Sequence, residues 1–303
     1  MPASLLNPLR PPVFCPGCAH ERVVKALDDA LQLLMRRGSE VAIVSDIGCS
    51  GLFDTFFHTH AFHGLHGRAL TYATGLKLAR PELTVVVTMG DGGLGIGGAH
   101  LLSACRRNLD LTLLVLNNFN FGMTGGQYSA TTPPDADVGS GFLNRLERPL
   151  DICGVARAAG APYVVRCSAY RSDLADVIRK AVEFKGFSVV DIWGICPGRF
   201  SKRNRLTTKV IEEMLSRLPP FEGDVPENQR REFGEHYREL GRVTAEYAHL
   251  DRLARAPAGE VFADLSGLER LEALRGRGVV LLSGHYSNFE LLGARVARLN
   301  PVD

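Results

Sequence analysis

The sequence alternates short apolar runs with longer stretches of helical periodicity between residues 41 and 193. Each run is rich in Val, Ile or Leu and is flanked by Gly, Pro or Asp, a pattern typical of strands buried on both faces. Such alternation predicts parallel strands joined by crossover helices. We therefore predict an α/β fold with a doubly wound, mostly parallel sheet. The expected strands are 41–47, 83–90, 111–117, 163–167 and 188–193.

The composition changes near Leu218-Pro219-Pro220, where the α/β pattern gives way to a charged stretch with few strand formers. Helical spacing upstream predicts helices over 20–36, 172–185 and 207–217. We expect a first domain over 1–217, a linker over 218–226, and a small, incomplete α/β segment over 227–303.

The charge balance excludes some functions. The chain of 303 residues has 35 basic and 33 acidic side chains, so its net charge of +2 gives no electrostatic reason to expect nucleic acid or an acidic membrane face as partner. No apolar run is long enough to span a bilayer, and we expect a cytoplasmic protein. Seven cysteines in such a chain favour metal or redox use of some thiols over a disulfide framework.

Two glycine- or asparagine-rich blocks follow neighbouring expected strands. Gly90-Asp91-Gly92-Gly93 ends the strand over 83–90, and Asn117-Asn118 ends the strand over 111–117. In a right-handed βαβ unit both blocks emerge at the carboxyl edge of the sheet, where ligands bind. The Asp91 carboxylate, the Asn118 amide oxygen and the main-chain carbonyl of Asn120 would suit Mg²⁺ holding a diphosphate. A helix beginning after Gly93 would direct its positive end toward the phosphates.

Other interpretations of these blocks are weaker. Each could be an ordinary turn, because Gly, Asp and Asn are common in turns, but the helix and strand between them favour a shared site. A dinucleotide site does not fit, because the glycines do not follow the G-x-G-x-x-G order and Asp91 would repel a pyrophosphate without a metal.

The cysteine spacing alone leaves several possibilities. Cys15-Pro16-Gly17-Cys18 could be a redox pair, half of a zinc site, two inert thiols or part of an iron–sulfur cluster. The histidines between 58 and 66 could in principle share zinc, but a partner pair at a second locus is not apparent.

Several motifs carry a resemblance to a known family. FCPGCAH, SDIGCSG, LHGRALTYATGLKLARPEL and the stretch from VVVTMGDGG to GMTGGQYSATTP follow one another in collinear order. From about 14 to 205 the chain resembles the thiamine-diphosphate-binding beta subunits of 2-oxoacid:ferredoxin oxidoreductases. Several relatives have Asp after GDG and Tyr before GMTGGQ, where this chain has Gly93 and Phe121.

The resemblance implies thiamine diphosphate, Mg²⁺ and a [4Fe–4S] cluster as cofactors. Magnesium would be held by Asp91, Asn118 and Asn120, and the loop from Gly122 to Gln127 would lie beside the diphosphate. Four thiolates would hold the cluster, which suits soft sulfur ligands: Cys15, Cys18, Cys49 and Cys196. The other cysteines are expected to be core residues: Cys105, Cys153 and Cys167.

The resemblance also places the histidine loop at the cofactor. His66 and Arg68 are expected near the diphosphate or the substrate carboxylate, with His66 as the catalytic candidate, whereas His58, His60 and His100 are expected to be ordinary. The complete set of expected cofactor-binding residues is Ile47, Gly48, Cys49, Ser50, His66, Arg68, Gly90, Asp91, Gly92, Gly93, Asn118, Asn120, Gly122, Met123 and Thr124.

The implied reaction is the oxidative decarboxylation of a 2-oxoacid, of the 2-oxoglutarate or pyruvate type. Electrons would pass through the cluster to ferredoxin and the acyl group to coenzyme A. An alpha subunit would supply the glutamate that activates the cofactor, so the chain is expected to be inactive alone. The alternatives are a non-oxidative thiamine-diphosphate decarboxylase or carboligase, and a fusion to an acyltransferase remnant.

The remnant interpretation comes from a second resemblance near the end of the chain. GRGVVLLSGHYSNFELLG is similar to lysophospholipid and lipid A acyltransferases, in which a His and an acidic residue activate the acceptor hydroxyl. His285 and Glu290 have the matching spacing. Because the long stretch that completes this family's sheet does not follow, we expect a truncated domain.

Overall fold

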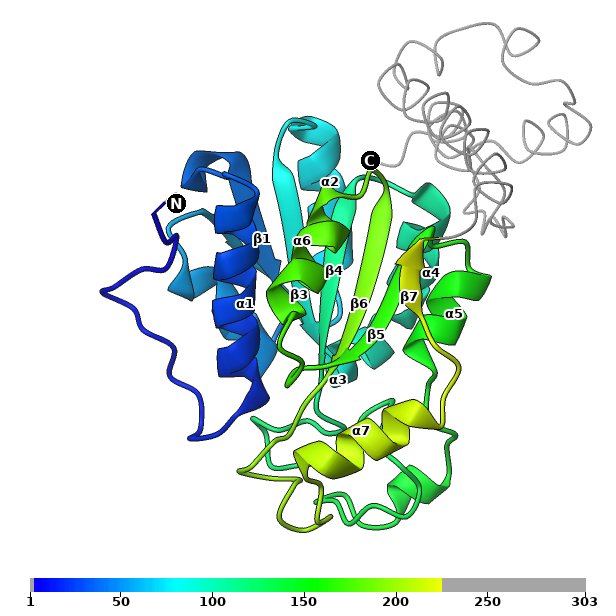
Figure 1. Ribbon diagram of the computed structural model, residues 1–303. Helices are drawn as coiled ribbons and strands as arrows, with labels where there is room; N and C mark the ends of the chain where they lie inside the picture. Colours follow the sequence, from blue (N-terminus) through cyan, green and yellow to red (C-terminus); the bar gives the residue numbers. More distant parts are fainter. Residues whose placement is uncertain (1–2, 225–303) are drawn as a thin grey trace, which may run out of the picture. The chain divides into compact units, whose positions relative to one another are not determined.

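The computed structural model describes residues 3–224, which lie within the first of two units of the chain, Met1–Phe233 (Figure 1). The expected acyltransferase-like segment, with His285 and Glu290, lies outside the described residues. Among the helices that the structure describes, none is both long and apolar enough to cross a membrane.

A seven-stranded sheet forms the centre of the described part (Figure 1), in the order β2-β1-β3-β4-β6-β5-β7. All neighbouring strands pair in parallel except β7, which runs antiparallel to β5. The predicted α/β class with a mostly parallel sheet is therefore confirmed. The strands are β1 (Val41–Ser45), β2 (His60–His63), β3 (Thr84–Gly90), β4 (Leu111–Asn117), β5 (Tyr163–Ser168), β6 (Phe187–Trp193) and β7 (Glu222–Asp224).

Helices cover both faces of the sheet. On one face, α1 (Ala19–Leu33) and α6 (Leu174–Glu183) pack over a core that includes Leu114 and Leu116 of β4. On the other face, the core includes Leu113 and Val115 of the same strand. Because successive residues of β4 enter opposite cores, most positions of this strand are apolar. The helices on the second face are α2 (Ala69–Ala79), α4 (Gly98–Arg107) and α5 (Ile152–Ala158).

Two further helices lie at the carboxyl end of the parallel strands, as Figure 1 shows: α3 (Asp91–Ile96) and α7 (Thr208–Ser216). The helix that was expected to begin after Gly93 is in fact two helices, and the first begins at Asp91 itself, with Gly90 as its N-cap. Three short 3₁₀ segments complete the elements: η1 (Gly38–Glu40), η2 (Cys49–Phe56) and η3 (Leu143–Arg145).

Two strands were not expected from the sequence. All four residues of β2 are exposed, because this strand forms the edge of the sheet, so it lacks the apolar signature of its neighbours. Residues 222–224 fall in the stretch that composition assigns to a linker, yet they form β7. The main-chain N–H of Arg166 also donates to the carbonyl of Phe221, at 3.0 Å. The sheet therefore extends past residue 218.

Candidate cofactor site and cysteine cluster

One cavity of about 100 Å³ opens at the carboxyl ends of β1, β3 and β4. Every expected cofactor-binding residue except Arg68 lines this cavity. The residues that line it are His20, Ile47, Gly48, Cys49, Ser50, His66, Gly90, Asp91, Gly92, Gly93, Leu116, Asn118, Asn120, Phe121, Gly122, Met123 and Thr124.

The strand register brings the two predicted magnesium-binding blocks together. Gly90 of β3 pairs with Leu116 of β4, so the residues after each strand emerge side by side. The main-chain N–H of Asn118 lies 3.4 Å from the Asp91 Oδ1. Asp91 and Asn118 are therefore neighbours, and both line the cavity.

The Asp91 carboxylate is held by two hydroxyl groups from the loop after the asparagines. Its Oδ2 accepts a hydrogen bond from Thr131 at 2.9 Å and contacts the hydroxyl of Ser129. The side chain is 1% exposed, and this burial raises the pKa of Asp91 above its ordinary value, although the hydroxyl donors act in the opposite direction. A buried carboxylate with no basic partner among these contacts is well suited to a cation.

Asn120, which lines the same cavity as Asp91, presents an unused acceptor. Its Nδ2 donates to the main-chain oxygen of Asn118 at 2.7 Å, whereas its Oδ1 is buried and has no hydrogen-bond partner. Phe119, between the two asparagines, has a φ of +63°, which turns the chain sharply after β4. An orphaned buried oxygen is costly unless a ligand satisfies it.

The fold also brings the distant cysteines toward one another. A β-carbon built on Gly198 would lie 3.4 Å from the Cys15 Sγ, and Gly198 follows Cys196 by two residues. The first N–H of α1, on Ala19, donates to the carbonyl of Ile195 at 3.4 Å. The two ends of the α/β body are therefore adjacent at this point.

Electrostatic coupling links all four thiols. Burial is the main cause that raises the pKa of Cys18 to about 12, and the neighbouring Cys196, Cys49 and Cys15 raise it further. Burial, followed by Cys196 and Cys15, also raises the pKa of Cys49. Cys18 and Cys49 are therefore protonated at neutral pH unless a metal displaces the protons.

The arrangement differs from that of a single-ion site. Within the part of the chain that the structure describes, no group of three or more His, Cys, Asp or Glu side chains is arranged to hold one metal ion. In a cubane each thiolate binds a different iron, so its cysteines stand farther apart than the ligands of one ion.

Gly122 lies where the cysteines meet the cavity. A β-carbon built on it would lie 3.3 Å from the Cys196 Sγ, 3.4 Å from the Asn120 Oδ1 and 3.7 Å from the Asn118 Nδ2. The absence of a side chain at Gly122 thus leaves room for the thiol and the two amide groups on one side of the backbone.

The histidine loop divides between two environments. His66 lines the cavity, and its Nδ1 lies 2.9 Å from the Oδ2 of the buried Asp46. Arg68 is exposed and lies outside the cavity lining, with its Nη1 2.6 Å from the Nε2 of His100. His58 and His60 are exposed.

The other cysteines, Cys105, Cys153 and Cys167, are all buried in the two main cores, as expected.

Sequence reasoning missed His20, which also lines the cavity. This side chain is 3% exposed, two residues after Cys18, and packs against the rings of Phe14 and Phe53. Burial lowers its pKa to about 4. Its place beside the C-x-x-C pair is the one signal that could have indicated it.

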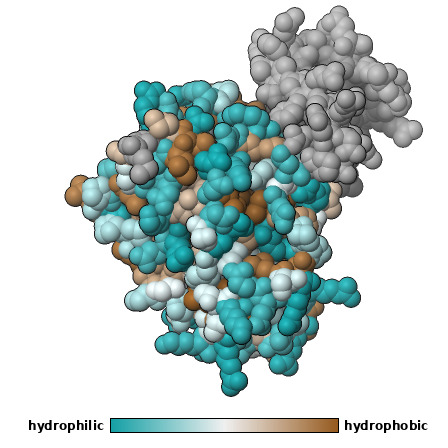
Figure 2. Space-filling model, in the orientation of Figure 1, coloured by the Kyte–Doolittle hydropathy of each residue, from teal (hydrophilic) through white to brown (hydrophobic). Residues whose placement is uncertain are grey.

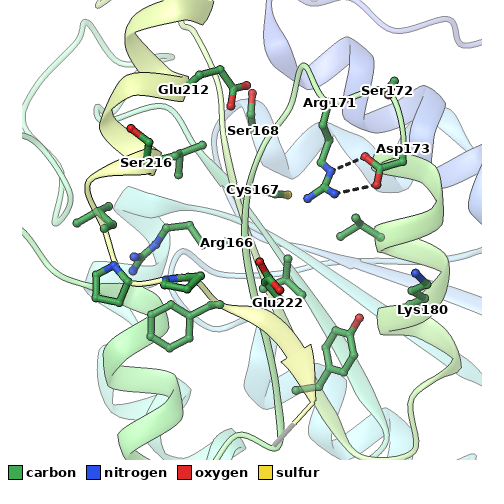
Figure 3. A pocket seen from close by; sticks show the side chains of 18 residues that line it. Arg166, Cys167, Ser168, Arg171, Ser172, Asp173, Lys180, Glu212, Ser216 and Glu222 are labelled. Atoms are coloured by element: carbon green, nitrogen blue, oxygen red, sulfur yellow. Dashed lines mark hydrogen bonds and ion pairs between the residues drawn. The ribbon is translucent and has the colours of Figure 1, made fainter.

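A larger cavity, of about 970 Å³, lies away from these residues (Figure 3). It is formed by β5, α6, α7 and residues 218–222, and contains no residue of the expected site. Its polar walls include the ion pair of Arg171 and Asp173, drawn in Figure 3. Figure 2 shows hydrophobic side chains on the same face, between α6 and α7. Size alone does not make this cavity the catalytic one.

The known proteins that resemble this chain agree with one another in family. Residues 46–192 match the family "Thiamine pyrophosphate enzyme, C-terminal TPP binding domain". The chain is 45% identical to the 2-oxoglutarate synthase subunit KorB of Archaeoglobus fulgidus over 195 residues, which cover 64% of this chain and 73% of that protein. It is 40% identical to the 2-oxoacid:ferredoxin oxidoreductase subunit beta of Saccharolobus solfataricus, over 61% of this chain and 62% of that one.

A solved structure shares the fold. The 2-oxoglutarate:ferredoxin oxidoreductase of Magnetococcus marinus, with 2-oxoglutarate, coenzyme A and succinyl-CoA bound, superposes with a TM-score of 0.65 at 29% identity, over 78% of this chain and 89% of that chain. Fold, motif order and relatives agree, and the chain belongs to the family of beta subunits of 2-oxoacid:ferredoxin oxidoreductases.

Proposed function

We propose that this chain is the thiamine-diphosphate-binding subunit of an enzyme that oxidatively decarboxylates a 2-oxoacid, reduces ferredoxin and transfers the acyl group to coenzyme A. The observation that carries the proposal is the approach of the Cys196 thiol and the Asn120 amide oxygen to one point beside Gly122, the position of the β-carbon that glycine lacks. A cysteine cluster beside a diphosphate site suits a reaction in which decarboxylation and electron transfer are coupled.

The residues at the cavity fit magnesium diphosphate. Asp91, the Asn118 side chain and the Asn120 carbonyl would bind Mg²⁺, since this ion prefers carboxylate and neutral oxygen ligands. The unpaired Oδ1 of Asn120 offers one more acceptor at the same place. When bound, thiamine diphosphate supplies the carbanion-stabilising chemistry that decarboxylation requires.

The four cysteines fit a [4Fe–4S] cluster held by Cys15, Cys18, Cys49 and Cys196. Their mutual electrostatic influence indicates that they share one region. Cys18 and Cys196 are buried, which limits the access of oxygen and solvent to such a cluster. Cys15 is exposed, so the cluster would have one side toward the surface, where an electron acceptor could approach.

The size of the cavity supports a role for a second subunit. Pockets that enclose ligands of this kind have volumes of about 300–1,000 Å³, whereas this one holds about 100 Å³. We infer that an alpha subunit completes the site and that the chain alone is inactive. The names of the relatives favour 2-oxoglutarate as the substrate, with pyruvate as the second candidate.

The test is anaerobic co-expression with the alpha subunit, followed by iron, sulfide and thiamine assays and by 2-oxoglutarate-dependent reduction of ferredoxin. Cys196→Ala should remove iron and ferredoxin reduction, whereas the matched Cys105→Ala change, in the core away from the cavity, should retain both. A colourless, iron-free wild-type complex would overturn the proposal. Decarboxylation that persists fully in Cys196→Ala would favour the non-oxidative alternative.

We also propose that the α/β body ends after β7 and that the segment from 227 is a separate domain. A cut at residue 217 would remove β7 from the edge of β5, so the sharper test is truncation after residue 226. The truncated chain should retain iron and thiamine in the complex with its partner. Loss of both, with the full chain unaffected, would contradict this boundary.

A further inference from the structure

Asp46 is a fully buried carboxylate at the end of β1, with an exposed fraction of 0%. Its Oδ1 accepts a hydrogen bond from the main-chain N–H of Gly67 at 2.6 Å, and its Oδ2 lies 2.9 Å from the His66 Nδ1. Both oxygens are therefore engaged by two consecutive residues of the histidine loop. A carboxylate is an acceptor only, so in this contact the His66 Nδ1 carries the proton.

The opposite side of the His66 ring is available to a ligand. The residue lines the cavity, and its side chain is one-third exposed. The ring meets Phe121 edge to face, with centroids 5.8 Å apart and an interplanar angle of 88°. Because Nδ1 is occupied by Asp46, Nε2 is the nitrogen left for whatever enters the cavity.

Gly93 is part of the same arrangement. A β-carbon built on Gly93 would lie 1.8 Å from the Asp46 Oδ2 and 3.2 Å from the His66 Cε1. Any side chain at position 93 would therefore displace the Asp46 carboxylate. The β-carbon of a residue at position 93 would itself take the place of the Asp46 Oδ2, beside the imidazole, so a carboxylate attached to it would begin within reach of the ring.

We propose that Asp46 is a positioning residue that fixes the tautomer and the ring orientation of His66, so that Nε2 faces the bound cofactor and 2-oxoacid. The identity of the ligands that Nε2 faces rests on the proposed function, whereas the pairing of Asp46 with His66 does not. The geometry further implies that the carboxylate can be supplied from position 46 or from position 93, but not from both.

The first test observes the ring directly and needs no cofactor. In the full chain with ¹⁵N-labelled histidine, His66→Gln assigns the His66 resonances, which are read at a pH where the ring is neutral. We expect the Nδ1–H tautomer in the wild type. In Asp46→Asn the side-chain oxygen can keep the Gly67 bond while its amide donates to Nδ1, so the Nε2–H tautomer should dominate. An Nε2–H ring in the wild type, or no change in Asp46→Asn, would overturn the inference.

The second test measures kcat/KM of the assembled enzyme. Asp46→Asn should lower it on the order of a hundredfold, as misplacement of a reacting group does. Adding Asp46→Asn to His66→Gln should cause no further loss, because Asp46 acts through His66. Asp46→Gly combined with Gly93→Asp should recover most of the loss, whereas Asp46→Gly alone should not. Additive losses, or no recovery in the double variant, would overturn the inference.

Asp54 provides the matched control. It is also buried and lies 3.6 Å from the Nδ1 of a histidine in the same region, His63, but His63 does not line the cavity. Asp54→Asn should leave kcat/KM unchanged; an equal loss would overturn the specific role of Asp46. A wild-type complex without any 2-oxoacid activity would refute the proposed function, while the tautomer measurement would still decide the inference.

Discussion

The Cys196 thiol and the Asn120 amide oxygen approach the same side of Gly122, at 3.3 and 3.4 Å from the position of its missing β-carbon. These two residues lie in segments far apart in the sequence, one after β6 and the other after β4, which are neighbouring strands. Parallel pairing of β4 with β6 thus joins the cysteine group to the diphosphate edge. The expected cluster ligand and the expected magnesium site therefore meet on one side of Gly122.

Gly122→Ala should therefore disturb both sites at once. The added methyl group would meet Cys196 and Asn120 at distances shorter than most real contacts, so one of them must shift by a few tenths of an ångström. We expect reduced iron content and weaker binding of thiamine diphosphate in the assembled complex, while the chain stays folded. Both quantities can be measured on one preparation, by iron assay and by calorimetry.

Gly75→Ala is the matched change for this experiment. Gly75 lies in α2, has no atom within 4 Å of its missing β-carbon and does not have a positive φ. Alanine there should stabilise the helix by roughly 0.5–1 kcal/mol and leave iron and cofactor unchanged. Loss of thiamine binding with full iron content in Gly122→Ala would argue against a shared contact.

Cluster assembly should depend strongly on pH. The pKa values of Cys18, about 12, and of Cys49 are raised mainly by burial, so binding of iron must displace protons from these thiols at neutral pH. Lowering the pH makes that displacement harder, by about tenfold in affinity per pH unit for each proton released. Anaerobic reconstitution, followed by visible absorption, should therefore become less complete as the pH falls. A flat profile would show that the thiols are already ionised.

His20 should make the apoprotein sensitive to acid. Burial lowers its folded pKa to about 4, below the ordinary value of 6.5, so the unfolded chain binds a proton that the folded chain rejects. Stability from this group is complete above about pH 6.5 and is lost as the pH falls toward 4, on the order of 3 kcal/mol in total. Thermal midpoints of wild type and His20→Gln, measured across this window, should converge at low pH. The exposed His58→Gln change should run parallel to the wild type.

The apolar runs were sufficient to predict the fold class, because residues of β3, β4 and β6 are buried on both faces and these strands are rich in Val, Ile and Leu. β2 could not be found in this way, since its four residues are exposed and its strand character comes from pairing with β1. β7 was missed for a related reason: three residues carry too little pattern to be told from a linker.

Some residues of the candidate site could also be predicted from the sequence, and others could not. Asp91 and Asn118 could be predicted as site residues because each directly follows a buried strand, and the four cysteines because their motifs resemble those of a known family. Asp46 could not, because the same carboxylate would pass as an ordinary strand end, and its importance depends on the approach of His66 and on the space left by Gly93. His20 was hidden by its helix, since a buried histidine there resembles core packing.

Asp91→Asn should separate stability from ligand binding. Burial raises the pKa of this carboxyl group in the folded chain, so its ionised form lowers stability as the pH rises from about 4 toward neutrality. The neutral amide avoids that cost, and the unliganded variant should melt higher than the wild type at neutral pH. Mg²⁺ with thiamine diphosphate should raise the midpoint of the wild-type complex but not that of the variant. The matched change is Asp28→Asn, because Asp28 is buried, is engaged by Ser4, Leu5 and Gln32, and does not line the cavity. It should lower the midpoint and preserve the ligand-induced rise; a rise that survives in Asp91→Asn would remove Asp91 from the magnesium site.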